Sequence, residues 1–94
     1  DYPGISPLHC FLKDAKRARY TAASDEEALS AYKLVTKFEK LRPSLEPCHA
    51  FSVAISESKK LSRDTVVVVN SCGDAYKDKG ILEKRLGKKY VKSN

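Results

Sequence analysis

The sequence predicts an α/β fold, in which a partial sheet forms the middle of three layers and helices flank it. Helical and strand-like segments alternate along the chain, and this order is typical of a sheet with helices on both faces. Residues 65–70, TVVVVN, show no alternation of apolar and polar side chains. Strands of this kind are usually buried on both faces, as in parallel sheets. The 94 residues are enough for a single small domain.

The first quarter of the chain predicts a loop, a short helix and a short strand. Prolines and a glycine mark residues 1–8 as a loop. Residues 9–16 predict a short helix with Cys10 and Phe11 facing inward. Residues 19–23, RYTAA, fit a short strand.

The clearest predicted element is a helix from Ser24 to about Leu41. Ser24 and Glu27 fit a capping box, in which the two side chains satisfy free amides at the helix start. Pro43 ends the helix, because the residue before a proline is pushed out of helical geometry. Apolar residues at helical spacing predict one buried stripe, made of Ala28, Tyr32, Val35 and Phe38.

The second half predicts two more helices around the apolar strand. A helix starts near Glu46, since Pro47 is tolerated in a first turn. Its inward side would carry Ala50, Val53, Ala54 and Leu61. A turn at residues 63–64 leads into the strand at 65–70, and residues 77–86 predict a last amphipathic helix.

Composition and charge narrow the possible classes of protein. The net charge of +6 is compatible with a nucleic-acid or acidic-membrane partner. The basic residues of 77–92 are interspersed with Asp78 and Glu83, however, so a solvated helix surface explains them more simply. The longest apolar run, Val66 to Val69, is far too short to cross a membrane.

Three cysteines, Cys10, Cys48 and Cys72, are widely spaced and form no paired motif. This pattern argues against a disulfide framework and a structural zinc site, and it favours a reducing, cytoplasmic setting. No signal peptide is visible, and a start at Asp1 instead of Met suggests that preceding sequence is missing.

Two local groups are candidates for chemistry. Ser71, Cys72 and Gly73 follow the apolar strand, and ligands of α/β sheets bind beyond the carboxyl ends of strands. A plain strand-to-helix turn explains the same residues. Glu46 and His49 share one face of a helix start and could act as acid or base. Glu46 could equally be a favourable charge at the helix N-terminus.

Three stretches together resemble the C-terminal part of the tryptophan synthase β subunit family. They are DYPGISPLHCFLKDAKRARY, then SDEEALSAYKLVTKFEKLRPSLEPCHAF, and finally TVVVVNSCGDAYKD. The resemblance covers nearly the whole chain, in the family's order and spacing. It implies a pyridoxal-phosphate (PLP) enzyme of fold type II, in which residues 1–94 form a C-terminal portion of one domain.

The resemblance also implies roles for single residues. Glu46 matches the active-site glutamate that assists proton transfers, and Asp1 matches an aspartate that pairs with an arginine when the enzyme closes. The backbone carbonyls of Tyr2 and Gly4 match positions that hold a monovalent cation. Cys72 matches the serine that faces the pyridine nitrogen of PLP.

The turn departs from the family pattern. The family's Ser-Gly-Arg-Gly-Asp corresponds to Cys72-Gly73-Asp74-Ala75-Tyr76, so an arginine and a glycine are lost. A one-residue gap would instead place Ser71 at the ring nitrogen. The ungapped alignment keeps Asn70, Lys77 and Asp78, and it favours Cys72.

The family's cofactor lysine, phosphate loop and mobile domain have no counterpart in these residues. The resemblance therefore implies a fragment that is inactive alone. In the complete enzyme its partners would be the missing N-terminal part of the β chain, a second β chain, the α subunit, and the substrates L-serine and indole. Two alternatives stay open: a small basic module that binds nucleic acid or protein, and a fragment of another fold type II lyase.

Overall fold

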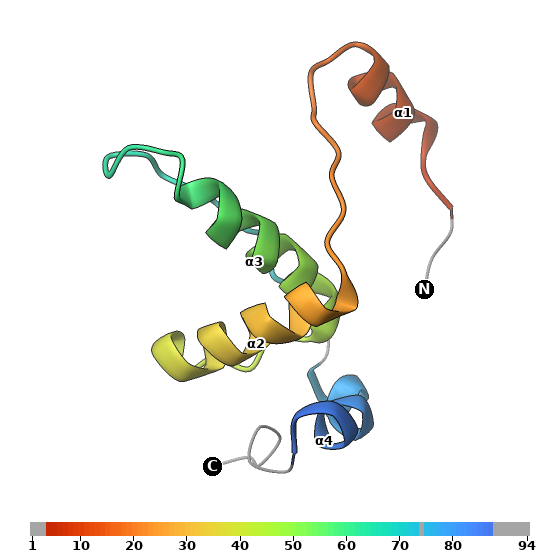
Figure 1. Cartoon of the computed structure of the whole chain (residues 1–94). Coiled ribbons are helices and arrows are strands. Elements are labelled where there is room, and N and C mark those ends of the chain that lie inside the picture. Colours follow the sequence, from red (N-terminus) through yellow and green to blue (C-terminus); the bar gives the residue numbers. More distant parts are fainter. Residues whose placement is uncertain (1–3, 74, 88–94) are drawn as a thin grey trace.

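In the computed structural model of the chain, residues 4–73 and 75–87 are described, and they contain helices but no strand (Figure 1). The elements are α1 (Pro7–Asp14), α2 (Asp25–Glu39), α3 (Leu45–Ser58), the 3₁₀ helix η1 (Ala75–Asp78) and α4 (Lys79–Leu86). The predicted α/β fold with a three-layer sheet is therefore wrong for the described residues.

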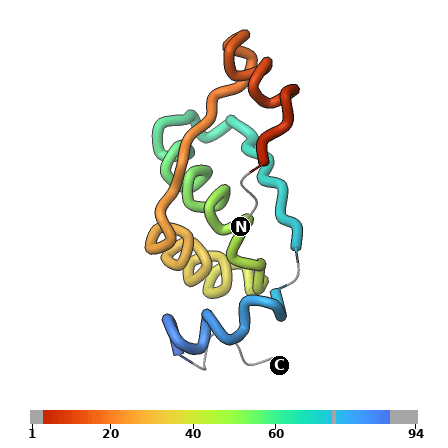
Figure 2. The backbone as a smooth tube through the Cα atoms, turned by 90° about the vertical axis from the view of Figure 1, so that its right-hand side faces the viewer, coloured from red at the N-terminus to blue at the C-terminus, as the bar shows by residue number. Residues whose placement is uncertain are grey.

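The segment predicted as a buried strand, residues 65–70, has no strand assignment. A strand is defined by hydrogen bonds to a neighbour, and no other strand exists among the described residues. The side chains of Val66 and Val68 are 84% and 88% exposed, while Val69 is half-buried. The segment runs back along α3 (Figure 2), so it covers the helices with one side only, where the sequence predicted burial on both.

Residues 19–23, the other predicted strand, belong to the linker that joins α1 to α2 (Figure 1). The Arg19 guanidinium lies 3.1 Å from the Glu57 carboxylate of α3, and the Tyr20 hydroxyl lies 2.7 Å from Nδ1 of His9. Side-chain contacts, not a ladder of backbone hydrogen bonds, thus hold the linker.

Helix α1 starts two residues earlier than predicted, because Pro7 occupies its first turn and Ser6 caps it. The Ser6 hydroxyl accepts a hydrogen bond from the His9 amide at 3.4 Å. The prediction that Cys10 and Phe11 face inward is wrong, since both side chains are exposed.

Helix α2 confirms the predicted capping box. The Glu27 amide donates to the Ser24 hydroxyl at 3.2 Å, and the Ser24 amide donates to the Glu27 carboxylate at 3.0 Å. These bonds hold the pKa of Glu27 below its usual range. The helix ends at Glu39, before the predicted Leu41, because Lys40 adopts a left-handed conformation with φ of 56°. Of the predicted stripe, only Phe38 is exposed.

Helix α3 has Pro47 in its first turn, as predicted, and buries it together with Cys48. The predicted inward side is only partly correct, because Ala50 is exposed and Leu61 lies beyond the helix end. Burial is concentrated at the start of α3, where the helix meets α2 and α4.

The core is small and lies where α2, the start of α3 and α4 meet. Its members are Ala28, Leu29, Tyr32, Cys48 and Leu82, with Leu45 and Leu86 packed against them. In both views α4 and α1 lie at opposite ends of the molecule (Figures 1 and 2), so this core leaves α1 uncovered. Of the helices among the described residues, none has the length and apolar character of a membrane span.

Candidate functional site

Three consecutive residues at the start of α3 bind three residues of the segment that follows residue 71. The Ser44 hydroxyl donates to the Cys72 carbonyl at 2.8 Å. The Leu45 amide donates to Oδ2 of Asp78 at 2.7 Å. The Lys77 ammonium donates to Oε1 of Glu46 at 3.1 Å. The two sequence candidates, Glu46 and the turn at 71–73, therefore lie on segments that touch each other.

Glu46 occupies the first turn of α3, where the free backbone amides favour a negative charge. Its side chain is 45% exposed, and that of its partner Lys77 is 43% exposed. A pair this open to water contributes little to stability. The pair mainly orients the Glu46 side chain, because it draws the carboxylate towards η1 and the turn before η1.

Ser71 and Cys72 are both exposed, so a hydroxyl and a thiol are open to a ligand at this turn. Gly73 adopts a φ of +100°, which L residues rarely take, and a Cβ there would lie 2.7 Å from the Ser44 hydroxyl oxygen. Glycine is thus required for close approach to Ser44.

A hydroxyl or a thiol at this turn has the chemistry that the resemblance implies for the group facing the pyridine nitrogen of PLP.

Burial changes the chemistry of Cys48, one turn into α3. Its thiol is fully buried and donates to the Ser44 carbonyl at 3.2 Å. Loss of water around it, with a smaller contribution from the nearby Asp78 carboxylate, raises the pKa of Cys48 to about 11. This thiol is therefore a structural group and a poor nucleophile at neutral pH.

His49, the second sequence candidate on α3, is held by its own helix. Its Nδ1 lies 3.2 Å from the carbonyl oxygens of Leu45 and Glu46, and its Nε2 lies 3.4 Å from the Asp25 carboxylate of α2. Both ring nitrogens thus have contacts within the fold. The imidazole therefore links α3 to α2.

A polar cavity of about 320 Å³ opens between α4 and the starts of α2 and α3. Glu46, His49 and Asp78 are among its lining residues, whereas residues 71–73 are not. Glu46 therefore borders this cavity, but the turn at 71–73 does not. The two are connected instead by the contacts of Ser44 and Lys77.

Two residues of the predicted site, Asp1 and Tyr2, lie outside the described residues. Gly4 is exposed in the segment before α1, and α1 lies at the far end of the molecule from α4 (Figure 1). The structure therefore does not bring Gly4 together with Glu46. Among the described residues, no group of three or more His, Cys, Asp or Glu side chains could hold a metal ion.

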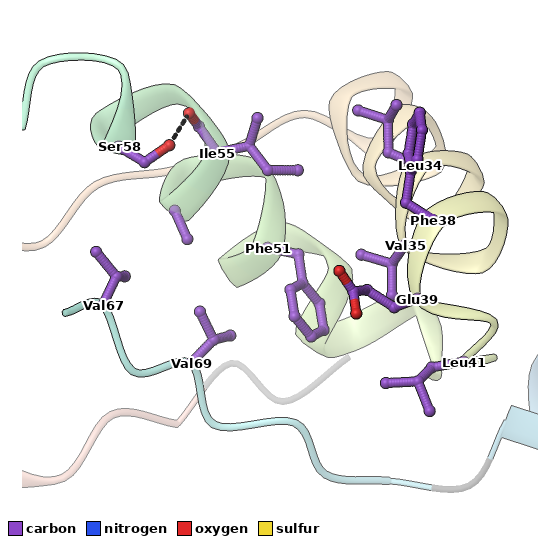
Figure 3. A pocket seen from close by; sticks show the side chains of 11 residues that line it. Leu34, Val35, Phe38, Glu39, Leu41, Phe51, Ile55, Ser58, Val67 and Val69 are labelled. Carbon is purple, nitrogen blue, oxygen red and sulfur yellow. Dashed lines mark hydrogen bonds between the residues drawn. The ribbon is translucent and has the colours of Figure 1, made fainter. Parts of the chain in front are cut away.

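A second concave surface, the apolar groove, lies between α2, α3 and the extended segment at 65–70 (Figure 3). It has a volume of about 520 Å³ and is lined mainly by apolar residues of α2, α3 and the extended segment. Its aliphatic and aromatic lining consists of Leu34, Val35, Phe38, Leu41, Phe51, Ala54, Ile55, Val67 and Val69. Glu39 and Ser58 are its polar lining residues.

Sequence reasoning missed Ser44 and Asp78, which join the start of α3 to the segment after residue 71. Ser44 has the position of a helix cap, yet its hydroxyl donates to the Cys72 carbonyl and makes no capping bond to α3. Asp78 contacts a residue 33 positions away, and no local pattern reports such a contact.

Comparison with known proteins identifies a relative that matches nearly the whole chain. No family model matches the chain. The tryptophan synthase β chain of Fusobacterium nucleatum subsp. nucleatum is 42% identical to it over 89 residues. The match covers 95% of this chain but 22% of the relative, so the chain spans about a fifth of the length of that curated relative.

The similarity thus relates the chain to a segment of a biosynthetic enzyme. More particularly, it belongs to the tryptophan synthase β chain family, as a segment related to part of such a chain.

Proposed function

We propose that the chain is the C-terminal portion of a PLP-dependent tryptophan synthase β chain, which joins L-serine and indole to give L-tryptophan. The observation that carries the proposal is the contact between the start of α3 and the turn at 71–73. Through it, an acidic side chain, Glu46, and a neutral thiol or hydroxyl stand on adjoining segments. The similarity over 95% of the chain supports the same assignment.

PLP, when bound, would supply the electron sink for the carbanion chemistry. The Glu46 carboxylate would move a proton beside it, helped by its open position at the helix start. Cys72, or Ser71 in the alternative alignment, would face the ring nitrogen as a neutral partner. Gly73 would keep that turn against Ser44.

The remaining roles rest on the resemblance. Asp1 would pair with an arginine of a mobile domain and exclude water on closure. The carbonyls of Tyr2 and Gly4 would hold a monovalent cation. The cytoplasm, a β–β dimer and an α subunit that supplies indole are part of the same proposal.

We expect the chain alone to be inactive, because the lysine that carries PLP in this family has no counterpart in these residues. When the chain is mixed with PLP, its absorbance spectrum should show no stable band from a cofactor bound covalently to a lysine. The apolar groove supports a role within a longer chain, since an uncovered surface of this kind is typical of an interface. The occupant we propose for it is the rest of the β chain.

A chimera tests the proposal. The segment of the Fusobacterium nucleatum β chain that matches this protein is replaced by the present chain, and tryptophan formation from L-serine and indole is measured. We expect an active chimera in which Glu46→Gln lowers kcat by about tenfold or more. Asp64→Asn, which changes an exposed carboxylate in the turn after α3, should leave kcat unchanged.

An inactive chimera beside an active parent enzyme would overturn the proposal. So would an active chimera in which Glu46→Gln has no greater effect than Asp64→Asn.

A further inference from the structure

We propose that Asp78 is a positioning residue of this site. Its carboxylate holds the first turn of α3, and through that turn it fixes where Glu46 stands relative to the turn at 71–73. The inference rests on the proposed function, because Glu46 is the group that would act on the substrate.

The first step concerns a missing cap. A helix start leaves four amides without helical partners, and the residue before the helix usually accepts from one of them. Ser44 has this place on α3 but makes no such bond, because its hydroxyl donates to the Cys72 carbonyl. Binding the turn at residue 72 therefore leaves the start of α3 without its local cap.

The second step is that Asp78 supplies the missing acceptor. Its Oδ2 accepts from the Leu45 amide at 2.7 Å, a short distance that suits a charged acceptor. The side chain is buried, with 8% of Asp78 exposed, so water competes little for this bond. A carboxylate at a helix N-terminus is also favoured by the helix dipole.

The third step is geometric. Asp78 stands at the N-cap position of α4, yet its side chain makes no capping bond to α4. One carboxylate thus ties the start of α4 to the start of α3. Its chain neighbour Lys77 pairs with Glu46, so the residues at 77 and 78 hold consecutive residues at 46 and 45.

The consequence is a division of roles between the two neighbours. The Lys77–Glu46 pair is half-exposed and can exchange with water. The Asp78–Leu45 bond is sheltered and fixes the backbone from which Glu46 extends. Removal of the Asp78 carboxylate should therefore misplace Glu46 even where Lys77 is intact.

The test is a double-mutant cycle in the active chimera described above. Asp78→Ala should lower kcat by about tenfold while the KM for L-serine changes by less than about twofold. In a Glu46→Gln background the same substitution should change kcat by less than about twofold, because the group that it misplaces is already gone. Asp64→Ala, in the exposed turn after α3, is the matched control.

Asp78→Asn provides a second variant, because its amide oxygen can still accept from Leu45. It should recover most of the rate lost in Asp78→Ala, and it keeps the cycle measurable if the alanine variant does not fold. Losses of equal size with and without Glu46, for whichever variant folds, would show general destabilisation and overturn the inference.

A third measurement separates this inference from the proposed function. In the isolated chain, the Leu45 amide should exchange slowly with solvent and lose that protection in Asp78→Ala, as read by NMR hydrogen exchange. Unprotected exchange in the original chain would refute the cap itself. An inactive chimera with a protected Leu45 amide would instead refute the function and leave the cap standing.

Discussion

Among single residues, Ser44 connects more of the site than its small side chain suggests. It is 2% exposed, its hydroxyl binds Cys72, and its carbonyl accepts from the Cys48 thiol. The atoms of one serine thus join the turn at 71–73 to the second turn of α3. Ser44 is therefore one of the residues that hold together the two segments that carry the proposed chemistry.

Cys48 gives a prediction about pH. Its pKa is raised from 9.0 to about 11 by burial, so folding favours the neutral thiol. The thiol's contribution to stability is therefore complete below pH 9 and is lost as the pH rises towards about 11. Urea unfolding between these pH values should show stability falling for the original chain.

Cys48→Ala should lower stability at neutral pH, because it leaves a cavity in the core, but it should flatten the fall between pH 9 and about 11. Part of the fall should remain, since burial also raises the pKa of Tyr32 above 10.0. An unchanged slope in the alanine variant would contradict the assignment to Cys48. Cys10→Ala, at an exposed cysteine, is the matched control.

At the scale of elements, the junction between α3 and the turn depends on the absence of a side chain at residue 73. In Gly73→Ala, the new methyl group would clash with the Ser44 hydroxyl. The alanine backbone would also have to adopt a φ of +100°. We expect a loss of about 1–3 kcal/mol in the free energy of unfolding, measured in urea. In a Ser44→Ala background the loss should be smaller, because the clashing oxygen is removed.

Gly80→Ala is the control, because nothing lies within 4 Å of a Cβ at that position and its backbone needs no special conformation. It should leave stability unchanged or increase it by up to about 1 kcal/mol. Equal effects at 73 and 80 would show that the contact with Ser44 is unimportant.

The elements also show how far the sequence could predict the fold. The start of α2 was predictable, since Ser24 and Glu27 form a local cap that depends on neighbours three residues apart. The prediction for the apolar run at 65–70 was wrong. Its residue types indicate a tendency to be extended, but they do not indicate whether a partner strand exists. Glu46 could be singled out, whereas its link through Asp78 spans 33 residues and no local pattern encodes it.

The whole molecule exposes more surface than its size requires. Its accessible area is 7,756 Å², against roughly 5,400 Å² for a compact monomer of this mass. The radius of gyration is 14.9 Å, whereas about 12 Å is typical of a compact domain of this length. In Figure 2, α1 projects beyond the α2–α3 pair, and the linker and the segment at 65–70 run along the outside of that pair, which adds to the exposed surface.

This open shape predicts that the isolated chain binds an apolar dye at the groove between α2, α3 and residues 65–70. Phe38 lines the groove and is 67% exposed. Phe11 on α1 is 65% exposed but lies outside the groove. Phe38→Ser should lower the fluorescence of bound anilinonaphthalene sulfonate by about twofold or more, since the dye reports contiguous apolar surface.

Phe11→Ser removes the same type of side chain at almost the same exposure. It therefore controls for dye binding to isolated exposed apolar residues outside the groove. It should leave most of the fluorescence in place. Helix content by circular dichroism should be equal in both variants, because neither phenylalanine belongs to the core of Ala28, Tyr32 and Cys48. Equal dye loss in the two variants would mean that the exposed apolar residues act independently, and that the groove is not a single binding surface.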